Sequence, residues 1–434
     1  MIRLDSSAAS FAADFAALVD ARRESDADVA RDVAAILRDV RGGGDAALRD
    51  LTLRLDRHDL DATGWRVSAA ECAAAFAGLS TELADALTLA AARIRAYHER
   101  QRPADLAFTD EVGVKLGARW RPVDAAGVYV PGGRAAYPST LLMNAIPARV
   151  AGVGRLVVVT PTPDGLVNPL VLAAAHLVGA DEVWRVGGAQ AIAALAWGTA
   201  RIAPVDVVTG PGNAWVAEAK RQVYGVVGID MVAGPSEIVV IADGANDPAW
   251  IAADLLSQAE HDVTTQSILF TDDAAFADRV ADAVARQLAT LATGATARAA
   301  WDAHGAIIIV PTLADACPLV DRLAPEHVEI ATDLPRALFD RLRHAGSAFL
   351  GRHTPEAIGD YLAGPNHVLP TGRRARFASG LGVTDFMKRT SFLELDAAAL
   401  DRLGPATVAL ATAEGLPAHA ASVALRLAGR KGVT

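Results

Sequence analysis

The chain has 434 residues, of which 52% are hydrophobic, 21% are charged and only 5% are aromatic. This composition predicts a folded protein of two or three domains with a core of Ala, Val and Leu, and it excludes a disordered chain. The formal net charge of -10, without a run of Lys and Arg interleaved with aromatics, argues against nucleic-acid binding.

Hydropathy and cysteine content indicate the compartment. The longest uncharged stretches, 165–180 and 186–200, are shorter than the ~18–20 residues of a membrane-spanning helix. Residues 1–5 carry no apolar signal core, so we expect no membrane association and a cytoplasmic location. Cys72 and Cys317 fit a reducing compartment, and we expect both to be buried free thiols.

The first hundred residues show the apolar spacing of helices, for example at Val29, Val33 and Ile36. The glycines at 42–44 are expected to end that helix. With Ala47 they also match a loose G-x-G-x-x-A pattern. No strand is expected before them, so the pattern favours a helix end over a dinucleotide site.

From about Val114, short runs rich in β-branched residues alternate with Ala-rich helices. This alternation predicts parallel α/β sheets with sites at the carboxyl ends of the strands, in two units separated near Tyr129 and Ser236. The final fifty residues are expected to return to helix. Strands are expected at 127–130, 156–160, 182–186, 238–241, 267–271 and 306–310, and helices at 140–151, 169–177, 189–197, 213–223 and 250–260.

Gln258 and His261 are candidate metal ligands because they stand three apart at the end of a predicted helix and share one face. Asp360 and His419 are further oxygen and nitrogen donors. Zinc requires three or four such donors, and mixed nitrogen and oxygen donors also accept Mn or Co. No H-E-x-x-H motif and no cysteine cluster is present, so a surface or structural histidine is the alternative at each position.

Glu326 and His327 place a carboxylate beside an imidazole, the two side chains most used to move protons near neutral pH. Neighbours in a regular strand face opposite ways. Pro325 predicts an irregular entry into a strand at 328–330, which allows both side chains to line one cleft. The alternative is a solvated polar loop.

Glycine-rich turns at 129–133, 209–213 and 234–237 border predicted strands and helices. Such turns bring backbone N–H groups close to a phosphate, and the alternative is a plain tight turn. No G-x-G-x-x-G sequence follows a predicted strand, so a nicotinamide dinucleotide would have to bind in a non-standard way.

Taken together and in order, eight stretches closely resemble the histidinol dehydrogenase family, and the resemblance covers nearly the whole chain. They are 128–139, 187–195, 210–213, 233–237, 258–262, 325–327, 364–371 and 414–416.

The resemblance implies oxidation of L-histidinol to L-histidine through L-histidinal, with two NAD and one zinc ion per subunit. It implies a homodimer whose sites borrow the C-terminal region of the partner. The implied fold has two incomplete Rossmann-like units with an N-terminal helical arm and a C-terminal helical tail. The domain bounds expected on this basis are an arm at 1–25, a first α/β domain at 26–128 with 237–380, a second at 129–236, and a dimerisation tail at 381–434.

The resemblance also implies residue roles. Glu326 and His327 match the acid–base pair. The zinc ligands match Gln258, His261, Asp360 and His419; the substrate contacts match Ser236, Gln258, His261, His327, Asp360, Glu414 and His419; and the NAD contacts match Tyr129, Gln190 and Asn213. Glu414 and His419 would come from the partner subunit. No cysteine lies in these motifs, so a thiohemiacetal intermediate has no nucleophile.

Two other functions compete with this interpretation. A related zinc- and NAD-dependent dehydrogenase of another polar alcohol, such as a sulfonated diol, would share the scaffold and the ligands but not the substrate contact at Glu414. A non-catalytic metal-binding protein on the same scaffold would have no need for Glu326 and His327 beside an intact ligand set.

Overall fold

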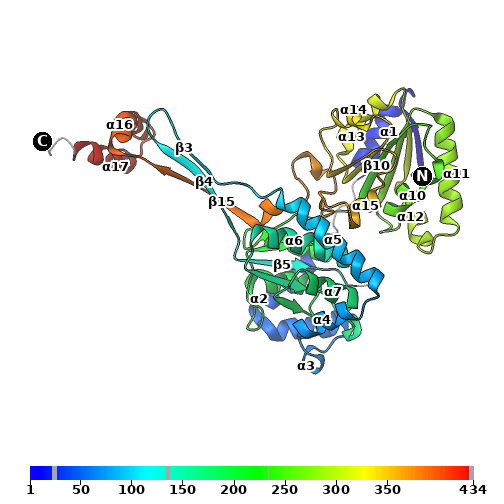
Figure 1. The fold of residues 1–434 in the computed structure, drawn as a ribbon, viewed down its shortest axis with the longest axis horizontal. Coiled ribbons are helices and arrows are strands. Elements are labelled where there is room, and N and C mark those ends of the chain that lie inside the picture. The colour runs from blue at the N-terminus through cyan, green and yellow to red at the C-terminus, as the bar shows by residue number, and fades with distance from the viewer. Residues whose placement is uncertain (22–26, 133–136, 233, 430–434) are drawn as a thin grey trace. The chain divides into compact units, whose positions relative to one another are not determined.

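The computed structural model describes residues 1–21, 27–132, 137–232 and 234–429. The chain divides into two compact units. Unit 1 comprises Met1–Gln101 and Val123–Phe386, and unit 2 comprises Arg102–Pro122 and Met387–Thr434. Unit 1 contains two six-stranded sheets covered by helices, and unit 2 contains a small antiparallel sheet and two helices (Figure 1).

Sheet A of unit 1 is entirely parallel, in the order β1-β12-β11-β10-β13-β14. Connections leave β10 in both directions, so the switch point lies between β10 and β13. Ile238 faces α10, α11 and α12, and Val239 faces α1 and α13, because strand side chains alternate. The strands are Ile2–Asp5 (β1), Glu237–Ala242 (β10), Gln266–Thr271 (β11), Ala306–Ile309 (β12), His327–Ala331 (β13) and Ser347–Leu350 (β14); the helices are Phe11–Asp20 (α1), Pro248–Ala259 (α10), Ala274–Leu288 (α11), Gly294–His304 (α12), Leu313–Leu323 (α13), Pro335–Phe339 (α14) and Glu356–Tyr361 (α15).

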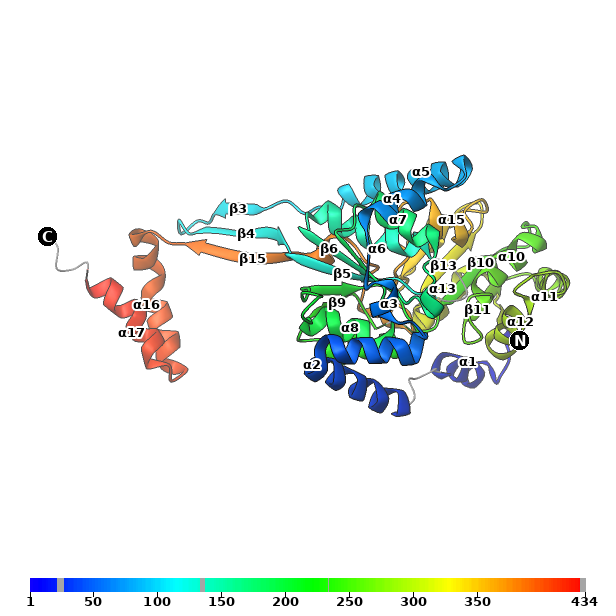
Figure 2. The same ribbon diagram turned by 90° about the horizontal axis from the view of Figure 1, so that it is seen from below.

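Sheet B of unit 1 repeats this topology in the order β2-β7-β6-β5-β8-β9, with only β2 antiparallel. Its switch point lies between β5 and β8. Helices α2, α8 and α9 cover one face, and α4 to α7 lie across the other (Figure 2). The strands are Arg66–Val67 (β2), Ala125–Tyr129 (β5), Arg155–Val159 (β6), Glu182–Trp184 (β7), Val207–Thr209 (β8) and Gly228–Ile229 (β9); the helices are Ala27–Asp56 (α2), Leu60–Thr63 (α3), Ala69–Ala77 (α4), Thr81–Glu99 (α5), Pro138–Ala151 (α6), Pro169–Leu177 (α7), Gly188–Trp197 (α8) and Ala214–Val223 (α9).

Unit 2 is built from segments far apart in the sequence. Strand β15 (Met387–Glu394) pairs antiparallel with β4 (Lys115–Pro122), which pairs with β3 (Leu106–Thr109). Helices α16 (Ala397–Ala413) and α17 (Pro417–Ala428) fold back on each other after β15 (Figure 2). The sequence predicted the helices but not this sheet.

The expected domain bounds need correction in three places. The region 26–101 does not accompany sheet A, because α2 packs on α8 and α9 in the core of sheet B. The N-terminal arm supplies a strand, β1, as well as a helix. The C-terminal part of unit 2 begins at Met387 rather than at 381, and the strands within 102–122 belong to the same unit. The predicted glycine break is present, since Gly44 has a φ of +53° and interrupts α2.

Over the described ranges, no single helix is both long enough and apolar enough to cross a membrane, although α4 and α5, bent by 119°, pass that test as a pair. Cys72 and Cys317 are both buried and unpaired, as predicted.

Candidate active site

The candidate catalytic residues lie at the amino edge of sheet A. His327 is the first residue of β13, directly after Glu326, and it pairs in register with Ile238 of β10 and Ser347 of β14. The prediction that sites lie at the carboxyl ends is therefore wrong for this sheet. The reason is that crossover helices run back along the sheet, so the C-terminal end of α10 reaches the amino edge.

His327 is buried and holds its ring in a defined tautomer. Its Nδ1 lies 3.1 Å from the carbonyl oxygen of Glu237, and a carbonyl can only accept, so Nδ1 carries the proton and Nε2 the lone pair. Nε2 is buried without a hydrogen-bond partner among the described residues. Burial lowers the pKa of His327 to about 4. The residue is therefore a neutral imidazole at neutral pH, with Nε2 ready to accept a proton.

Glu326 is also buried, and its carboxyl group lies beside His327. Its Oε2 accepts a hydrogen bond of 3.0 Å from the backbone N–H of Glu237 and lies 3.7 Å from Nδ1 of His327. Burial raises the pKa of Glu326 well above its usual value, against the opposing effect of that hydrogen bond. The two side chains therefore lie close together at the entry to β13. That both line one cleft stays a prediction, because His327 but not Glu326 lines the adjoining cavity.

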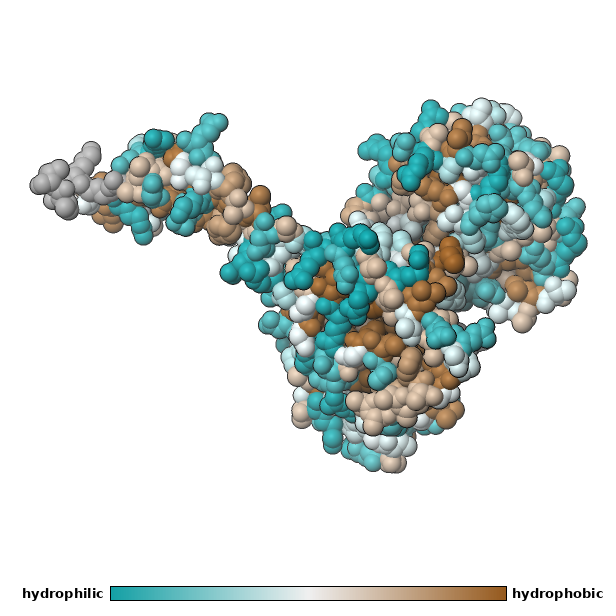
Figure 3. Space-filling view, in the orientation of Figure 1, coloured by the Kyte–Doolittle hydropathy of each residue, from teal (hydrophilic) through white to brown (hydrophobic). Residues whose placement is uncertain are grey.

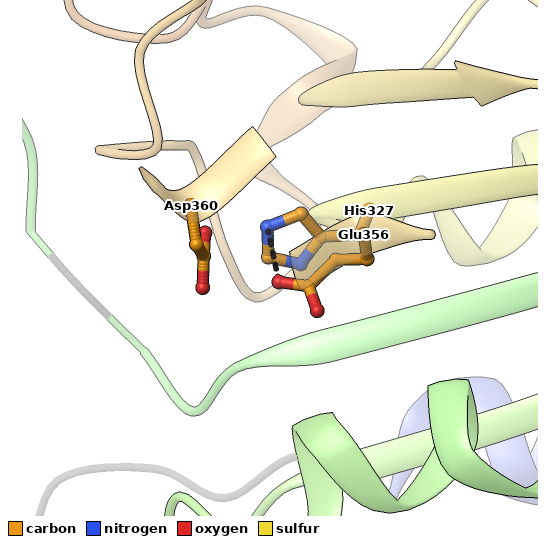
Figure 4. A group of neighbouring side chains, drawn as sticks. All are labelled: His327, Glu356 and Asp360. Carbon is orange, nitrogen blue, oxygen red and sulfur yellow. Dashed lines mark ion pairs between the residues drawn. The ribbon is translucent and has the colours of Figure 1, made fainter. Parts of the chain in front are cut away.

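A carboxylate pair on α15 faces this imidazole (Figure 4). Glu356 and Asp360 stand four residues apart and so share one face of the helix. Oε1 of Glu356 lies 3.8 Å from Nε2 of His327, and one donor atom from each of His327, Glu356 and Asp360 lies within 4.8 Å of the others. Burial, together with the charge of Asp360, raises the pKa of Glu356 to about 8.

Glu356 is not among the site residues predicted from the sequence. Its spacing from Asp360 was the available signal, because two carboxylates four apart in a helix point the same way. The helix itself is short, and no strong periodicity marks it.

Asp360 stays ionised. Burial acts to raise its pKa, but hydrogen bonding from His367 and the nearby His327 and His261 outweigh burial and lower the pKa. Nδ1 of His367 lies 3.1 Å from the carbonyl oxygen of Asp360 and 3.6 Å from Oδ1. An ionised carboxylate among imidazoles suits a divalent cation.

Gln258, His261 and Ser236 lie at the same edge. Gln258 is 1% exposed, and its Oε1 has no hydrogen-bond partner within the described part of the chain. Leaving such an oxygen unpaired costs roughly 1–3 kcal/mol, which a bound cation would offset. His261 is exposed, and it is close enough to affect the pKa values of His327 and Asp360. Ser236 directly precedes β10. These nitrogen and oxygen donors fit a zinc ion.

A cavity of about 230 Å³ adjoins the imidazole and opens between α15, the starts of β13 and β14, and the segment before residue 369. Three titratable side chains line it: His327, Asp360 and His367. The rest of its wall is mainly apolar, including Phe349, Ile358 and Leu369. A small amphiphilic substrate with polar groups at one end matches this lining.

The two remaining predicted residues of the zinc and substrate sets belong to unit 2. Glu414 follows α16 at its C-cap, and His419 is in the first turn of α17. Both are exposed.

The predicted NAD contacts gather at the carboxyl edge of sheet B, where the sequence placed them. Tyr129 ends β5, and its hydroxyl accepts a hydrogen bond of 3.2 Å from the N–H of Gly188. Burial raises the pKa of Tyr129 to about 12. Gln190 is buried on α8, and its Oε1 has no partner among the residues described. Asn213 follows β8 and caps α9. A dinucleotide crevice is expected at such a switch point.

Comparison with known proteins gives one consistent result. The histidinol dehydrogenase family profile matches residues 19–427. Histidinol dehydrogenases from Zymomonas mobilis and Rhodospirillum rubrum are each 62% identical over 98% of this chain, covering 99% and 98% of their own lengths. The crystal structure of histidinol dehydrogenase from Elizabethkingia anophelis superposes with a TM-score of 0.94 at 34% identity, over 100% of this chain and 99% of that one.

These matches give no support to a dehydrogenase of another polar alcohol. They extend over both α/β sheets and unit 2, so they include each segment that carries a candidate site residue. The chain belongs to the histidinol dehydrogenase family.

Proposed function

We propose that this chain oxidises L-histidinol to L-histidine through L-histidinal, the closing steps of histidine biosynthesis, with two NAD as hydride acceptors. Family membership supports this, with 62% identity over nearly the full length. The observation that carries it is the buried, neutral His327, whose Nδ1 lies beside Glu326 and whose Nε2, close to Glu356 and Asp360, has no hydrogen-bond partner among the described residues.

Zinc would be held by Gln258, His261 and Asp360, with His419 of the partner subunit. When bound, it would orient the substrate through its amino and imidazole nitrogens and so supply the effect of proximity. Support comes from the unpaired Oε1 of Gln258 and from the ionised Asp360. Ser236 and Glu414 would complete the contacts to the substrate.

In the first oxidation His327 would accept the hydroxyl proton of histidinol at Nε2, as the carbon-bound hydrogen leaves as hydride to NAD. The tautomer supports this role, because Nδ1 is committed to the carbonyl of Glu237. A general base with a defined lone pair contributes about 10²–10⁴-fold in rate.

In the second oxidation Glu326 would accept a proton from water as the water oxygen attacks the aldehyde carbon of histidinal. The resulting hydrate then loses a second hydride to NAD and a proton, which yields the carboxylic acid. Burial supports this role, because it brings the pKa of Glu326 up from its ordinary acidic value. Tyr129, Gln190 and Asn213 would contact NAD at the carboxyl edge of sheet B.

A homodimer with shared sites is part of the proposal. Unit 2 buries few large side chains by itself and exposes many apolar ones: Leu106, Phe108, Phe392, Leu393, Leu410 and Leu425 are each more than 40% exposed. Brown apolar patches on this unit are visible in Figure 3. Such a surface is typical of an interface, and we propose a second copy as its occupant. A cytoplasmic location is also proposed, since both cysteines are free.

A stoichiometry assay tests the function. We expect two NADH per L-histidinol consumed, with activity lost after chelation and restored by zinc. One NADH per substrate, with free aldehyde accumulating, would contradict the four-electron reaction. Faster turnover of a sulfonated diol than of histidinol would contradict the substrate.

A further inference from the structure

A fully buried ion pair lies beneath the predicted dinucleotide crevice. Nζ of Lys220, on α9, pairs with Oδ1 of Asp230, which follows β9, and the two side chains are 2% and 1% exposed. Burying two charges costs several kcal/mol per ion, and well-packed apolar residues are often as stable. The pair therefore calls for a local explanation other than fold stability.

The pair holds both backbone groups of a single residue, Gly210. Nζ of Lys220 donates to the Gly210 carbonyl at 2.9 Å, and the Gly210 N–H donates to Oδ2 of Asp230 at 2.8 Å. Among the described residues, the side chains of the pair make one further hydrogen bond, which Oδ1 of Asp230 accepts from the N–H of Met231 at 2.6 Å.

Gly210 lies in close contact with the C-terminal end of β5. Its φ is +114°, and a Cβ atom there would lie 2.1 Å from the carbonyl oxygen of Tyr129. Only glycine tolerates both conditions. Lys220 and Asp230 therefore fix how closely the turn after β8 approaches Tyr129.

The other end of the turn is fixed as well. Asn213 caps α9, with Oδ1 accepting from the N–H groups of Trp215 and Val216. The turn at 210–213 lies between these two fixed ends, at the switch point of sheet B. A backbone turn held in this way is preorganised, which reduces the entropy lost on ligand binding.

We propose that Lys220 and Asp230 are positioning residues for the dinucleotide: they hold the turn at 210–213 in its binding conformation without touching NAD. The proposal rests on the proposed use of NAD at this edge. It assigns the buried charges a role in cofactor affinity rather than in the chemical step.

The main test compares the double variant Lys220→Met/Asp230→Asn with the wild-type enzyme. The asparagine keeps an acceptor for the Gly210 N–H, while the charge–charge and lysine–carbonyl contacts are lost. We expect the KM for NAD to rise about tenfold, as the loss of a charged hydrogen bond predicts. The Kd for NADH, measured by fluorescence in the absence of histidinol, should rise by the same factor. The KM for histidinol and kcat should stay within about twofold, since neither residue lies at sheet A.

Arg221→Met is the matched control, because it removes a cation from the same helix where the side chain is 57% exposed. It should leave both NAD parameters unchanged. A double variant that binds NADH as tightly as wild type would overturn the inference while the proposed function stands. Failure of the wild-type enzyme to bind NADH would instead remove the proposed function, and this inference with it.

A second measurement needs no variant. If the turn is preorganised, the backbone amide of Gly210 should exchange with deuterium as slowly as the amides in the core of sheet B, both with and without NADH. Rapid exchange that slows only when NADH is added would mean that the dinucleotide orders the turn, and the inference would then be wrong.

Discussion

At the residue scale, burial sets the proton chemistry of the site. The same desolvation raises the pKa of Glu326 and lowers that of His327, because it disfavours the charged form of each. His327 is therefore neutral at neutral pH, so the contact of 3.7 Å between the two side chains is not a salt bridge. His327 can take up a proton at Nε2, and Glu326 can take one up in its ionised form, which its raised pKa makes a stronger base.

Replacing Glu326 with Gln tests that division of labour. The amide keeps the shape and the hydrogen bond from Glu237, but it cannot accept a proton from water. We expect a loss of about 10²–10⁴-fold in the oxidation of histidinal and less than about tenfold in single-turnover oxidation of histidinol. Equal losses in both half-reactions would contradict the assignment.

At the scale of elements, the segment that lines the cavity is tied to helices on sheet B. Nδ2 of Asn366 donates to the carbonyl of Met143 on α6 at 2.6 Å and lies 3.3 Å from Nε2 of His98 on α5. Nδ1 of His98 bonds the carbonyl of Ile94 at 2.8 Å, so Nε2 is the acceptor for Asn366. Helices α5 and α6 therefore help to position His367, which directly follows Asn366.

His98 predicts a dependence of stability on pH. Burial lowers the pKa of His98, so below about pH 6.5 the unfolded state binds a proton that the folded state does not. The stability from this group is present above pH 6.5 and is lost as pH falls, by at most about 1.4 kcal/mol per pH unit. His98→Gln should show a smaller fall in the free energy of unfolding between pH 7.5 and 5.5.

Urea denaturation with a chelator present at both pH values measures this without a contribution from metal loss. The exposed His353, changed to Gln, is the control and should keep the wild-type difference. If His98→Gln loses as much stability on acidification as wild type, the buried neutral state of His98 is wrong.

At the scale of the whole molecule, the proposal requires two chains for one site. His419→Asn should lower zinc content after dialysis, measured by metal analysis, because an amide is a weaker ligand than imidazole. Full zinc occupancy would remove His419 from the ligand set.

Mixing two inactive variants tests whether His419 acts between subunits. In a dimer of a Glu326→Gln chain with a His419→Asn chain, only a site that borrows unit 2 from its partner has all its residues intact. Random mixing should then restore about a quarter of wild-type activity, since half of the dimers are mixed and each has one intact site. No recovery, with mixed dimers shown to form, would place His419 in its own subunit's site.

The sequence by itself determined the local elements and the family. The β-branched runs of β6, β10 and β12 and the apolar spacing of α6 to α10 are set by residues close together in the sequence. The shared helix face of Gln258 and His261 follows from the same local spacing. The motif residues were recognisable because each motif consists of a few consecutive residues.

Only the tertiary structure decided which edge of sheet A carries the site, that Glu356 faces His327, that α2 belongs to sheet B, and that β4 pairs with β15. Each of these depends on contacts between residues tens to hundreds of positions apart. A local pattern shows that one face of a helix is apolar or that a strand is extended. Many other elements could pack against that face or pair with that strand, and only the packing of the complete chain selects the partner.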